Sequence, residues 1–227
     1  TTHAEYDQIH RGCDALIHNA AKMLFKEDEN SFVLVNTLSY GWSGAVKIPD
    51  AFKGYSLTTD DEKTLQIQEV GKETFVSIEL EPLSFKTISR GNKLNLINSK
   101  ADSHRLENQF IKYEFNNGEL VSIYDKTLKK EFLVGTGNVM SLYEDRPNNW
   151  DAWDIDFFYR DALIETAILD DISDVHKGDV LNQIKLKFSI GKSKIEQVVS
   201  LSSHSKRLDF KTAVEWNEKH KMLRVHF

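Results

Sequence analysis

The residues best suited to chemistry lie between positions 141 and 158, in the stretch SLYEDRPNNWDAWDIDFF. This stretch places Trp150 and Trp153 among carboxylates and amides, shortly after Pro147. Flat aromatic faces beside carboxylates are what a sugar-binding surface needs, because such rings combine a large apolar area with a polar rim. The same residues could also form a stiff, well-packed loop, so the stretch alone leaves both interpretations open.

Carboxylates in this stretch could supply an acid and a base. The candidates are Glu144, Asp145, Asp151, Asp154 and Asp156. Glycosidases of either stereochemistry use two such carboxylates. Calcium also binds carboxylates, but the glycine turn and terminal glutamate of the helix–loop–helix calcium site are missing. The alternative is that these Asp and Asn residues cap local backbone groups. Sugar contact is favoured over catalysis, because the two tryptophans offer stacking faces and Arg146 a forked donor.

A second candidate cluster lies near the N-terminus. His3, Asp7 and His10 occupy positions i, i+4 and i+7, so they share a helix face that could hold zinc or could simply be solvated. We favour the solvated face. Cys13 lies on the apolar stripe, and we expect it in a core rather than as a nucleophile. The sequence has no G-x-S-x-G elbow and no P-loop, so the residues alone give no complete catalytic constellation.

Composition excludes several classes of protein. The 227 residues are 40% hydrophobic and 28% charged, which is ordinary for one large or two modest globular domains. Acidic residues outnumber Lys plus Arg by 35 to 29, so neither nucleic acid nor an anionic membrane surface is an expected partner. A single cysteine fits a reducing compartment, and the N-terminus has no signal-peptide pattern. We therefore expect a cytoplasmic protein.

One helix is predicted, over residues 4–26. Its apolar face consists of residues that recur at steps of three and four: Ile9, Cys13, Leu16, Ala20 and Leu24. We expect this face either to lie on a sheet or to pack against helices from sequence outside the chain. After residue 30 the hydrophobic period changes to 2. Short strands are expected at 32–36, 45–49, 64–70, 74–80 and 83–88, which suggests a small antiparallel sandwich.

A second β region is expected after a polar, turn-rich junction. Strands at 110–115 and 120–124 flank Asn117-Gly118, a strong hairpin signal. Further strands are expected at 181–190, 194–201, 207–216 and 222–227. The alternation from Leu208 to Trp216 predicts one buried face. Without strand–helix–strand units we expect no parallel sheet. Phe227 lies within an alternating run, which suggests a segment of something longer.

Several stretches of the sequence resemble the family 38 glycoside hydrolases, the α-mannosidases. The stretch LENQFIKYEFNNGELVSIYDKTLKKEFL (106–133), followed by LYEDRPNNWDAWDID (142–156), resembles the start of the family's large C-terminal β-domain. VEWNEKHKMLRVHF (214–227) resembles a strand pair of that domain, and SFVLVNTLSYGWSGAVKIP (31–49) resembles the family's small middle sandwich. The resemblance covers essentially the whole chain in the family's order.

The resemblance implies a mainly β chain from a larger protein. In the family an N-terminal α/β barrel precedes a three-helix bundle and two sandwiches. Residues 1–28 would be the last bundle helix, 29–91 the small antiparallel β-sandwich, 92–103 the junction, and 104–227 the first part of a large galactose-mutarotase-like β-supersandwich. The family's zinc ligands and its aspartate nucleophile lie in the barrel and in an H-D motif, whereas Ala4 follows His3 here. No catalytic or metal residue is therefore assigned to this chain.

The resemblance also implies a function for the full-length parent, namely retaining hydrolysis of terminal α-D-mannosyl residues with zinc held outside this chain. The chain alone is expected to be inactive. Its partners would be an α-mannoside oligosaccharide or glycoside and the missing barrel, and a homo-oligomer is compatible with the family. One loop would face the substrate or the domain interface, and it carries Asp145, Arg146, Trp150, Asp151, Trp153, Asp154 and Asp156. A stand-alone carbohydrate-binding β module and a structural interaction domain remain alternatives.

Overall fold

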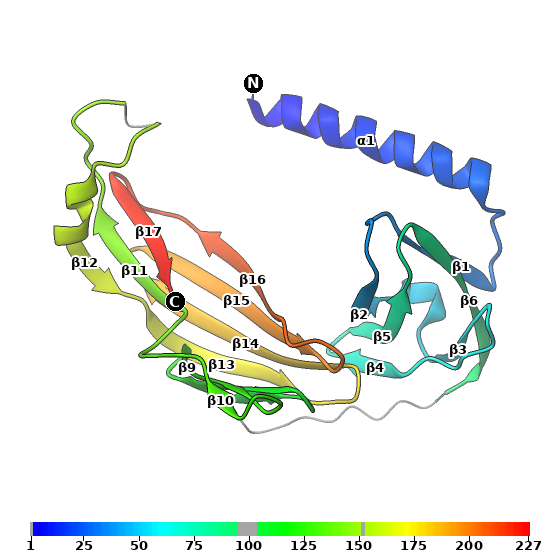
Figure 1. Cartoon of the computed structure of the whole chain (residues 1–227). Helices are drawn as coiled ribbons and strands as arrows, with labels where there is room; N and C mark the ends of the chain where they lie inside the picture. The colour runs from blue at the N-terminus through cyan, green and yellow to red at the C-terminus, as the bar shows by residue number, and fades with distance from the viewer. Residues whose placement is uncertain (1, 95–103, 151–152) are drawn as a thin grey trace. The chain divides into compact units, whose positions relative to one another are not determined.

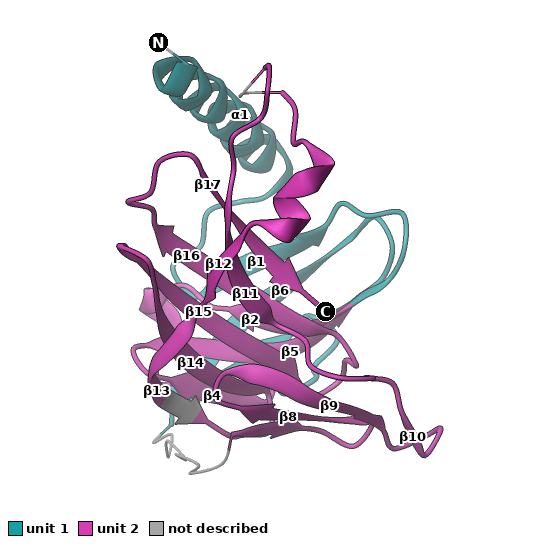
Figure 2. Ribbon diagram, turned by 90° about the vertical axis from the view of Figure 1, so that its left-hand side faces the viewer, with its two compact units in different colours: residues 1–42, 55–65, 80–94 teal, residues 43–54, 66–79, 95–227 magenta. Residues whose placement is uncertain are grey.

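The computed structural model describes residues 2–94, 104–150 and 153–227, which form one long helix and a series of antiparallel sheets (Figure 1). The chain forms two compact units (Figure 2). The first unit contains residues 1–42, 55–65 and 80–94, and the second contains 43–54, 66–79 and 95–227. All strand pairs in the described ranges are antiparallel, which confirms the prediction of no parallel sheet.

The helix α1 spans Thr2–Leu24, close to the predicted range, but none of its residues is buried. Leu16 and Leu24 are 72% and 75% exposed. The expectation that Cys13 lies in a core is wrong for this chain, since its side chain is exposed. The reason is that a lone helix has no surface on which to bury an apolar stripe. In the described part of the chain, no helix is both long enough and apolar enough to span a bilayer.

The first unit also contains a three-stranded sheet. Its order is β1-β6-β3, with β1 at Ser31–Asn36, β6 at Ser84–Lys93 and β3 at Tyr55–Thr59. Leu57 and Ile88 are fully buried in this unit. Just after α1, Phe25 packs edge-on against Phe85 of β6, with ring centroids 5.1 Å apart. The predicted junction at 92–103 falls mostly on residues outside the described ranges.

A second small sheet belongs to the second unit. Its order is β2-β5-β4, with β2 at Trp42–Lys47, β5 at Glu73–Leu80 and β4 at Ile67–Val70. A short 3₁₀ turn, η1, spans Asp50–Phe52. The Gln68 carboxamide oxygen of β4 accepts from the N–H groups of Val180 and Leu181 at 3.0 and 2.8 Å, and its nitrogen donates to the Leu181 carbonyl at 2.7 Å. Gln68 therefore joins this sheet to the start of the strand Leu181–Ile190 of the large sandwich.

The rest of the second unit is a large antiparallel sandwich with three sheets. The first has the order β10-β9-β8-β7, formed by Lys130–Glu131, Glu119–Asp125, Ile111–Asn116 and Arg105–Glu107. The second has the order β13-β14-β15-β16, formed by Ile168–His176, Leu181–Ile190, Ser193–Ser202 and Leu208–Glu215. The third has the order β12-β11-β17, formed by Leu163–Thr166, Val139–Glu144 and Lys221–His226.

One hydrophobic core joins these sheets. Side chains from β7 to β9, such as Leu106 and Phe115, share it with Leu186 and Val199 from β14 and β15. Strands β8 and β9 form the predicted hairpin, with Asn117 and Gly118 at φ values of 50° and 78°, as a tight primed turn requires. The predicted buried face of 207–216 is only partly correct, because Val214 and Trp216 are 41% and 39% exposed. In the described chain β16 is an edge strand that pairs only with β15.

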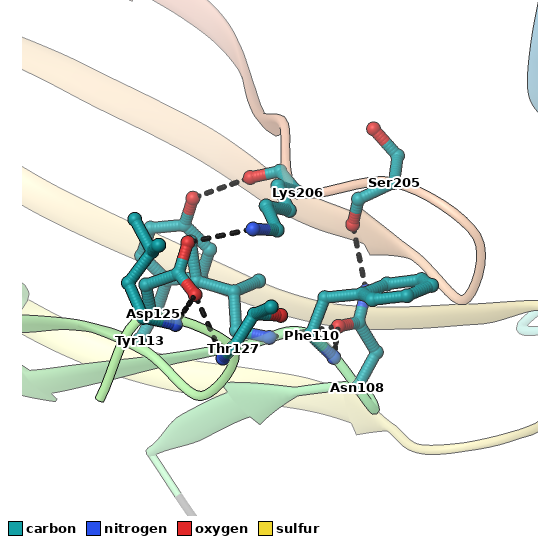
Figure 3. A network of polar contacts seen from close by, with 9 residues as sticks. Asn108, Phe110, Tyr113, Asp125, Thr127, Ser205 and Lys206 are labelled. Atoms are coloured by element: carbon teal, nitrogen blue, oxygen red, sulfur yellow. Dashed lines mark hydrogen bonds and ion pairs between the residues drawn. The ribbon is translucent and has the colours of Figure 1, made fainter. Parts of the chain in front are cut away.

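A polar network ties the β8–β9 hairpin to the turn between β15 and β16 (Figure 3). The Asn108 amide nitrogen donates to the carbonyls of Ser202 and Ser205 at 2.9 and 2.7 Å. Its amide oxygen accepts from the N–H groups of Phe110 and Ile111 at 2.9 and 3.1 Å. Both ends of this carboxamide are thus satisfied within the chain, which is what a partly buried polar group requires.

Asp125 forms the second half of the same network. Its carboxylate accepts from the N–H groups of Thr127 and Leu128 and from the Lys206 ammonium, the last at 2.7 Å. The hydrogen bond from Lys206, followed by that from the Leu128 N–H, holds the pKa of Asp125 below its ordinary value. The Tyr113 hydroxyl donates to the Lys206 carbonyl at 2.6 Å. Hydrogen bonds between Lys206 and both Tyr113 and Asp125 therefore hold the β8–β9 hairpin against the turn that contains Lys206.

Candidate functional site

The candidate site residues lie on the segment that joins β11 to β12, residues 145–162, here called the aromatic–acidic loop. In Figure 1 this segment extends beyond the end of β11. Its base is held at two points, because the Glu144 N–H donates to the Ala162 carbonyl at 2.9 Å and the Asp145 N–H donates to the His220 carbonyl at 2.8 Å. The sheet therefore fixes where the loop begins and ends.

Hydrogen bonds join the described residues at the tip of the loop. The Asn148 N–H donates to the Asp156 carboxylate at 2.8 Å, which joins the two sides of the tip. The N–H groups of Trp153 and Asp154 both donate to the Trp150 carbonyl, at 2.7 and 3.0 Å. Trp150 has a φ of 63°, a left-handed conformation that costs a non-glycine residue about 1–3 kcal/mol and is typical of functional sites.

The aromatic side chains of the loop are largely in solvent. Trp150 is 72% exposed, Trp153 88% and Phe157 78%, and Ile155 beside them is 53% exposed. Soluble proteins rarely leave large apolar side chains together at the surface unless that surface contacts a partner or ligand. The large side chains of the described part of the loop are thus exposed rather than packed against the rest of the chain.

Several of the polar residues line a small hollow of about 100 Å³ at the base of the loop. Asp145 and Asp156 line it together with the aromatic rings of Phe158 and Tyr159. Arg146 also lines it and pairs with Glu144 at 2.8 Å. Three of the candidate carboxylates, Glu144, Asp145 and Asp156, thus line one hollow beside aromatic residues, a combination that suits sugar hydroxyls.

The remaining candidates do not share this hollow. Trp150, Trp153 and Asp154 are exposed and are not among its lining residues, and Asp151 lies outside the described ranges. The loop therefore presents two different surfaces. One is a polar hollow near its base, and the other is an aromatic tip.

The three zinc candidates on α1 all lie on the surface of the helix. His3, Asp7 and His10 are all exposed, and positions i and i+7 of a helix lie about 10 Å apart along its axis. Among the described residues, no group of three or more His, Cys, Asp or Glu side chains is arranged to hold a metal ion. The favoured interpretation of these residues as a solvated face agrees with their exposure.

Sequence reasoning missed the side chains that support the loop from below. The loop ends in a short 3₁₀ turn, η2, at Phe157–Asp161. Tyr159 of this turn packs edge-on against Tyr143 of β11, with ring centroids 5.5 Å apart, and its hydroxyl accepts a hydrogen bond from Arg224 of β17. The only signal in the sequence was an arginine within the otherwise apolar alternation of the last strand. Nothing in the spacing connects it to Tyr159.

Comparisons with known proteins agree with this architecture. The sequence profile of the glycosyl hydrolases family 38 C-terminal domain matches residues 106–227. Alpha-mannosidase G of Dictyostelium discoideum is 30% identical over 136 residues, which are 52% of this chain and 12% of that protein. A solved protein in the glycosyl hydrolase family 38 from Enterococcus faecalis matches 88% of this chain and 33% of its own, with a TM-score of 0.63 and 15% identity.

A solved alpha-mannosidase from Enterococcus faecalis V583 matches similarly, with a TM-score of 0.60 and 16% identity over 88% of this chain and 31% of its own. At these identities the structures show a shared fold, mainly β with one helix. The chain spans about an eighth of the curated relative and about a third of the solved chains. Because the family profile matches more than half of the chain, over the sandwich that carries the loop, this protein belongs to glycosyl hydrolases family 38.

Proposed function

We propose that the chain is the non-catalytic middle and C-terminal portion of a retaining α-mannosidase that hydrolyses terminal α-D-mannosyl residues. In this proposal it braces an N-terminal barrel and presents the aromatic–acidic loop to the substrate. The observation that carries the proposal is a loop in a family 38 chain that exposes Trp150 and Trp153 at its tip and has a carboxylate-lined hollow at its base.

The side chains of the loop would bind and orient the sugar. The faces of Trp150 and Trp153 would stack on a pyranose ring. Asp145 and Asp156 would accept hydrogen bonds from its hydroxyls, and Arg146 would donate to its oxygens. In this proposal the zinc and the attacking carboxylate of this reaction class lie in sequence outside the chain, as the resemblance to family 38 implies.

The proposal extends to partners and location. The substrate would be an α-mannoside oligosaccharide or glycoside, and the principal protein partner would be the barrel of the same polypeptide. We also propose a cytoplasmic location, in keeping with the one cysteine, which is exposed. Self-association stays a prediction, which light scattering of the purified chain would check.

The central test compares the chain with its full-length parent. Hydrolysis of a chromogenic α-mannoside is measured for both, with and without zinc. We expect activity in the parent alone, because bond cleavage requires a nucleophile and an acid that this chain does not supply. Turnover of the mannoside by the 227-residue chain itself would contradict the proposal.

The role of the loop is tested by substitution in the parent. Trp153→Ala and Asp154→Ala are each expected to lower kcat/KM about tenfold or more, because a lost stacking or hydrogen-bonding contact costs about 1–3 kcal/mol. Phe132→Ala is a matched control, since Phe132 is 51% exposed but lies outside the loop. Unchanged kinetics in both loop variants would remove the loop from substrate handling.

A second candidate function is a stand-alone carbohydrate-binding module. It is favoured by the exposure of both loop tryptophans in the chain by itself. This alternative predicts that calorimetry detects binding of mannose oligosaccharides to the chain without the barrel. The main proposal predicts weak binding or none, because the other walls of the site would be missing. Tight binding to a separately made barrel, unaffected by mannoside, would instead favour a purely structural interaction domain.

A further inference from the structure

Four side chains form a bracket beneath the aromatic–acidic loop. They are Tyr143 of β11, Tyr159 of η2, and Arg224 and His226 of β17, and they are here called the loop bracket. The Tyr143 hydroxyl lies 3.2 Å from Nε2 of His226. The ring of Tyr159 packs edge-on against Tyr143, and the Arg224 guanidinium carbon lies 5.1 Å from the centre of the Tyr159 ring. The bracket therefore connects the loop to two paired strands.

Strand register explains why these side chains meet. Strands β11 and β17 are antiparallel neighbours, with Ser141 opposite Arg224 and Val139 opposite His226. Residues two apart on a strand, and residues opposite each other in a pair, lie on the same face of the sheet. Tyr143, Arg224 and His226 therefore share one face. The 3₁₀ turn that ends the loop lies against that face through Tyr159.

The bracket is linked to the tip through a continuous series of hydrogen bonds. The Tyr159 N–H donates to the Asp156 carbonyl at 3.1 Å, and the carboxylate of Asp156 accepts from the Asn148 N–H. On the other side, the Ala162 N–H donates to the Tyr159 carbonyl at 2.9 Å. Tyr159 thus lies between the base of the loop and its tip, and Arg224 donates a hydrogen bond to its hydroxyl.

We propose that Arg224 is a positioning residue for the aromatic–acidic loop. It acts through Tyr159, which it holds against β11, and so keeps Asn148 and Asp156 in the hydrogen-bonded arrangement beside the exposed Trp150 and Trp153. Arginine presents several N–H donors in a rigid planar fork, whereas a lysine ammonium is a point donor on a flexible stem, so lysine would hold the phenolic oxygen less firmly. That this positioning serves the handling of a mannoside rests on the function proposed above.

The first experiment measures the mobility of the loop in the 227-residue chain. Trp42→Phe and Trp216→Phe leave the loop residues Trp150 and Trp153 as the only tryptophans of the four. In this background, Arg224→Lys and Tyr159→Phe are each expected to increase the fast component of the fluorescence anisotropy decay about twofold, because a released loop moves on the nanosecond timescale. The double variant should show no further increase, since both changes break the same contact.

Two controls separate loop positioning from general stability. Arg207→Lys changes an exposed arginine that pairs with Asp209 away from the loop. Val199→Ala creates a cavity at a fully buried core position and should lower Tm without changing the anisotropy decay. If Arg224→Lys leaves the decay unchanged, or changes it no more than Val199→Ala does, the inference is overturned.

The second experiment measures the kinetics of the full-length parent. If the loop handles substrate, Arg224→Lys should lower kcat/KM about as much as Trp153→Ala, roughly tenfold, and the double variant should be little worse than either alone. Increased loop mobility with unchanged kinetics would support the positioning role of Arg224 and contradict the proposed function. The two claims therefore fail separately.

Discussion

The Asn108–Asp125 network and the aromatic–acidic loop use the same kinds of residue for opposite purposes. Both contain Asn, Asp and aromatic side chains, and both come from the stretches that resemble family 38. In the network, the Asp125 side chain is 6% exposed and accepts three hydrogen bonds within the chain. In the loop, Trp153 is 88% exposed. Where partners are internal, these residues hold the fold together, and where side chains face outward they are available to a ligand.

The largest effect on stability is expected at Asn108. Asn108→Ala would remove four hydrogen bonds, including those from its amide nitrogen to the carbonyls of Ser202 and Ser205. We expect a loss of about 2–4 kcal/mol in the free energy of unfolding, measured by urea denaturation. Asn149→Ala is the matched control, because Asn149 is exposed in the loop, and it should change stability by less than about 0.5 kcal/mol. Equal losses in the free energy of unfolding of the two variants would contradict the difference drawn between the network and the loop.

A smaller, pH-dependent effect is expected at Asp125. Its pKa is lowered in the folded state by Lys206 and by the Leu128 N–H. The Asp125 carboxylate therefore adds to the free energy of unfolding at pH values above its pKa in the unfolded chain, about 4. This stabilisation is lost as the pH falls through its pKa in the folded chain. Asp125→Asn should lower Tm at pH 7 by less than Asn108→Ala does, and the difference from the unsubstituted chain should shrink as the pH falls below 4. A difference that stays constant with pH would show that the ion pair does not contribute.

The smallest effect on stability is expected at the tip of the loop. Trp153→Ala should leave the free energy of unfolding of the chain within about 0.5 kcal/mol of its original value, because an exposed side chain buries little area. The same substitution should cost the parent most of its kcat/KM. A loss above about 1 kcal/mol in the free energy of unfolding of the chain would mean that Trp153 packs within the fold. The loop would then stabilise the fold, as the Asn108–Asp125 network does.

The β-strands that the sequence predicted are those with long apolar alternation. Strands β14 and β15 lie within one residue of their predicted bounds, and the hairpin turn at Asn117-Gly118 is correct. Strands β3, β7 and β10 to β13 were not predicted. Strand β10 has two residues, every residue of β12 is exposed, and β13 contains three aspartates. Such strands form because neighbouring strands supply hydrogen bonds. The hydrophobic pattern of the local sequence does not show which strands will be neighbours.

The candidate site was predictable only in part for a similar reason. The composition of the loop identified Asp145, Trp150 and Trp153, because acidic and aromatic residues side by side are unusual in a packed strand. The contact between Tyr159 and Arg224 joins residues that are 65 positions apart, and only the pairing of β11 with β17 brings them together. The sequence could not show whether α1 is buried. An apolar stripe indicates that a helix packs against another surface, but it does not show whether that surface is part of the same chain.

The hydrogen bonds between Gln68 and residues 180–181 limit how this polypeptide can be divided. A Cβ at Gly178 would lie 2.3 Å from the Gln68 side chain, so the two positions have to change together in any hybrid made from related enzymes. A shortened protein that starts at residue 104 would lose the acceptor for the Val180 and Leu181 amides. Residue 104, the boundary that the order of the domains along the sequence suggests, is therefore a poor place to truncate the protein. A hybrid of related enzymes should take the β4 segment and the large sandwich from the same parent.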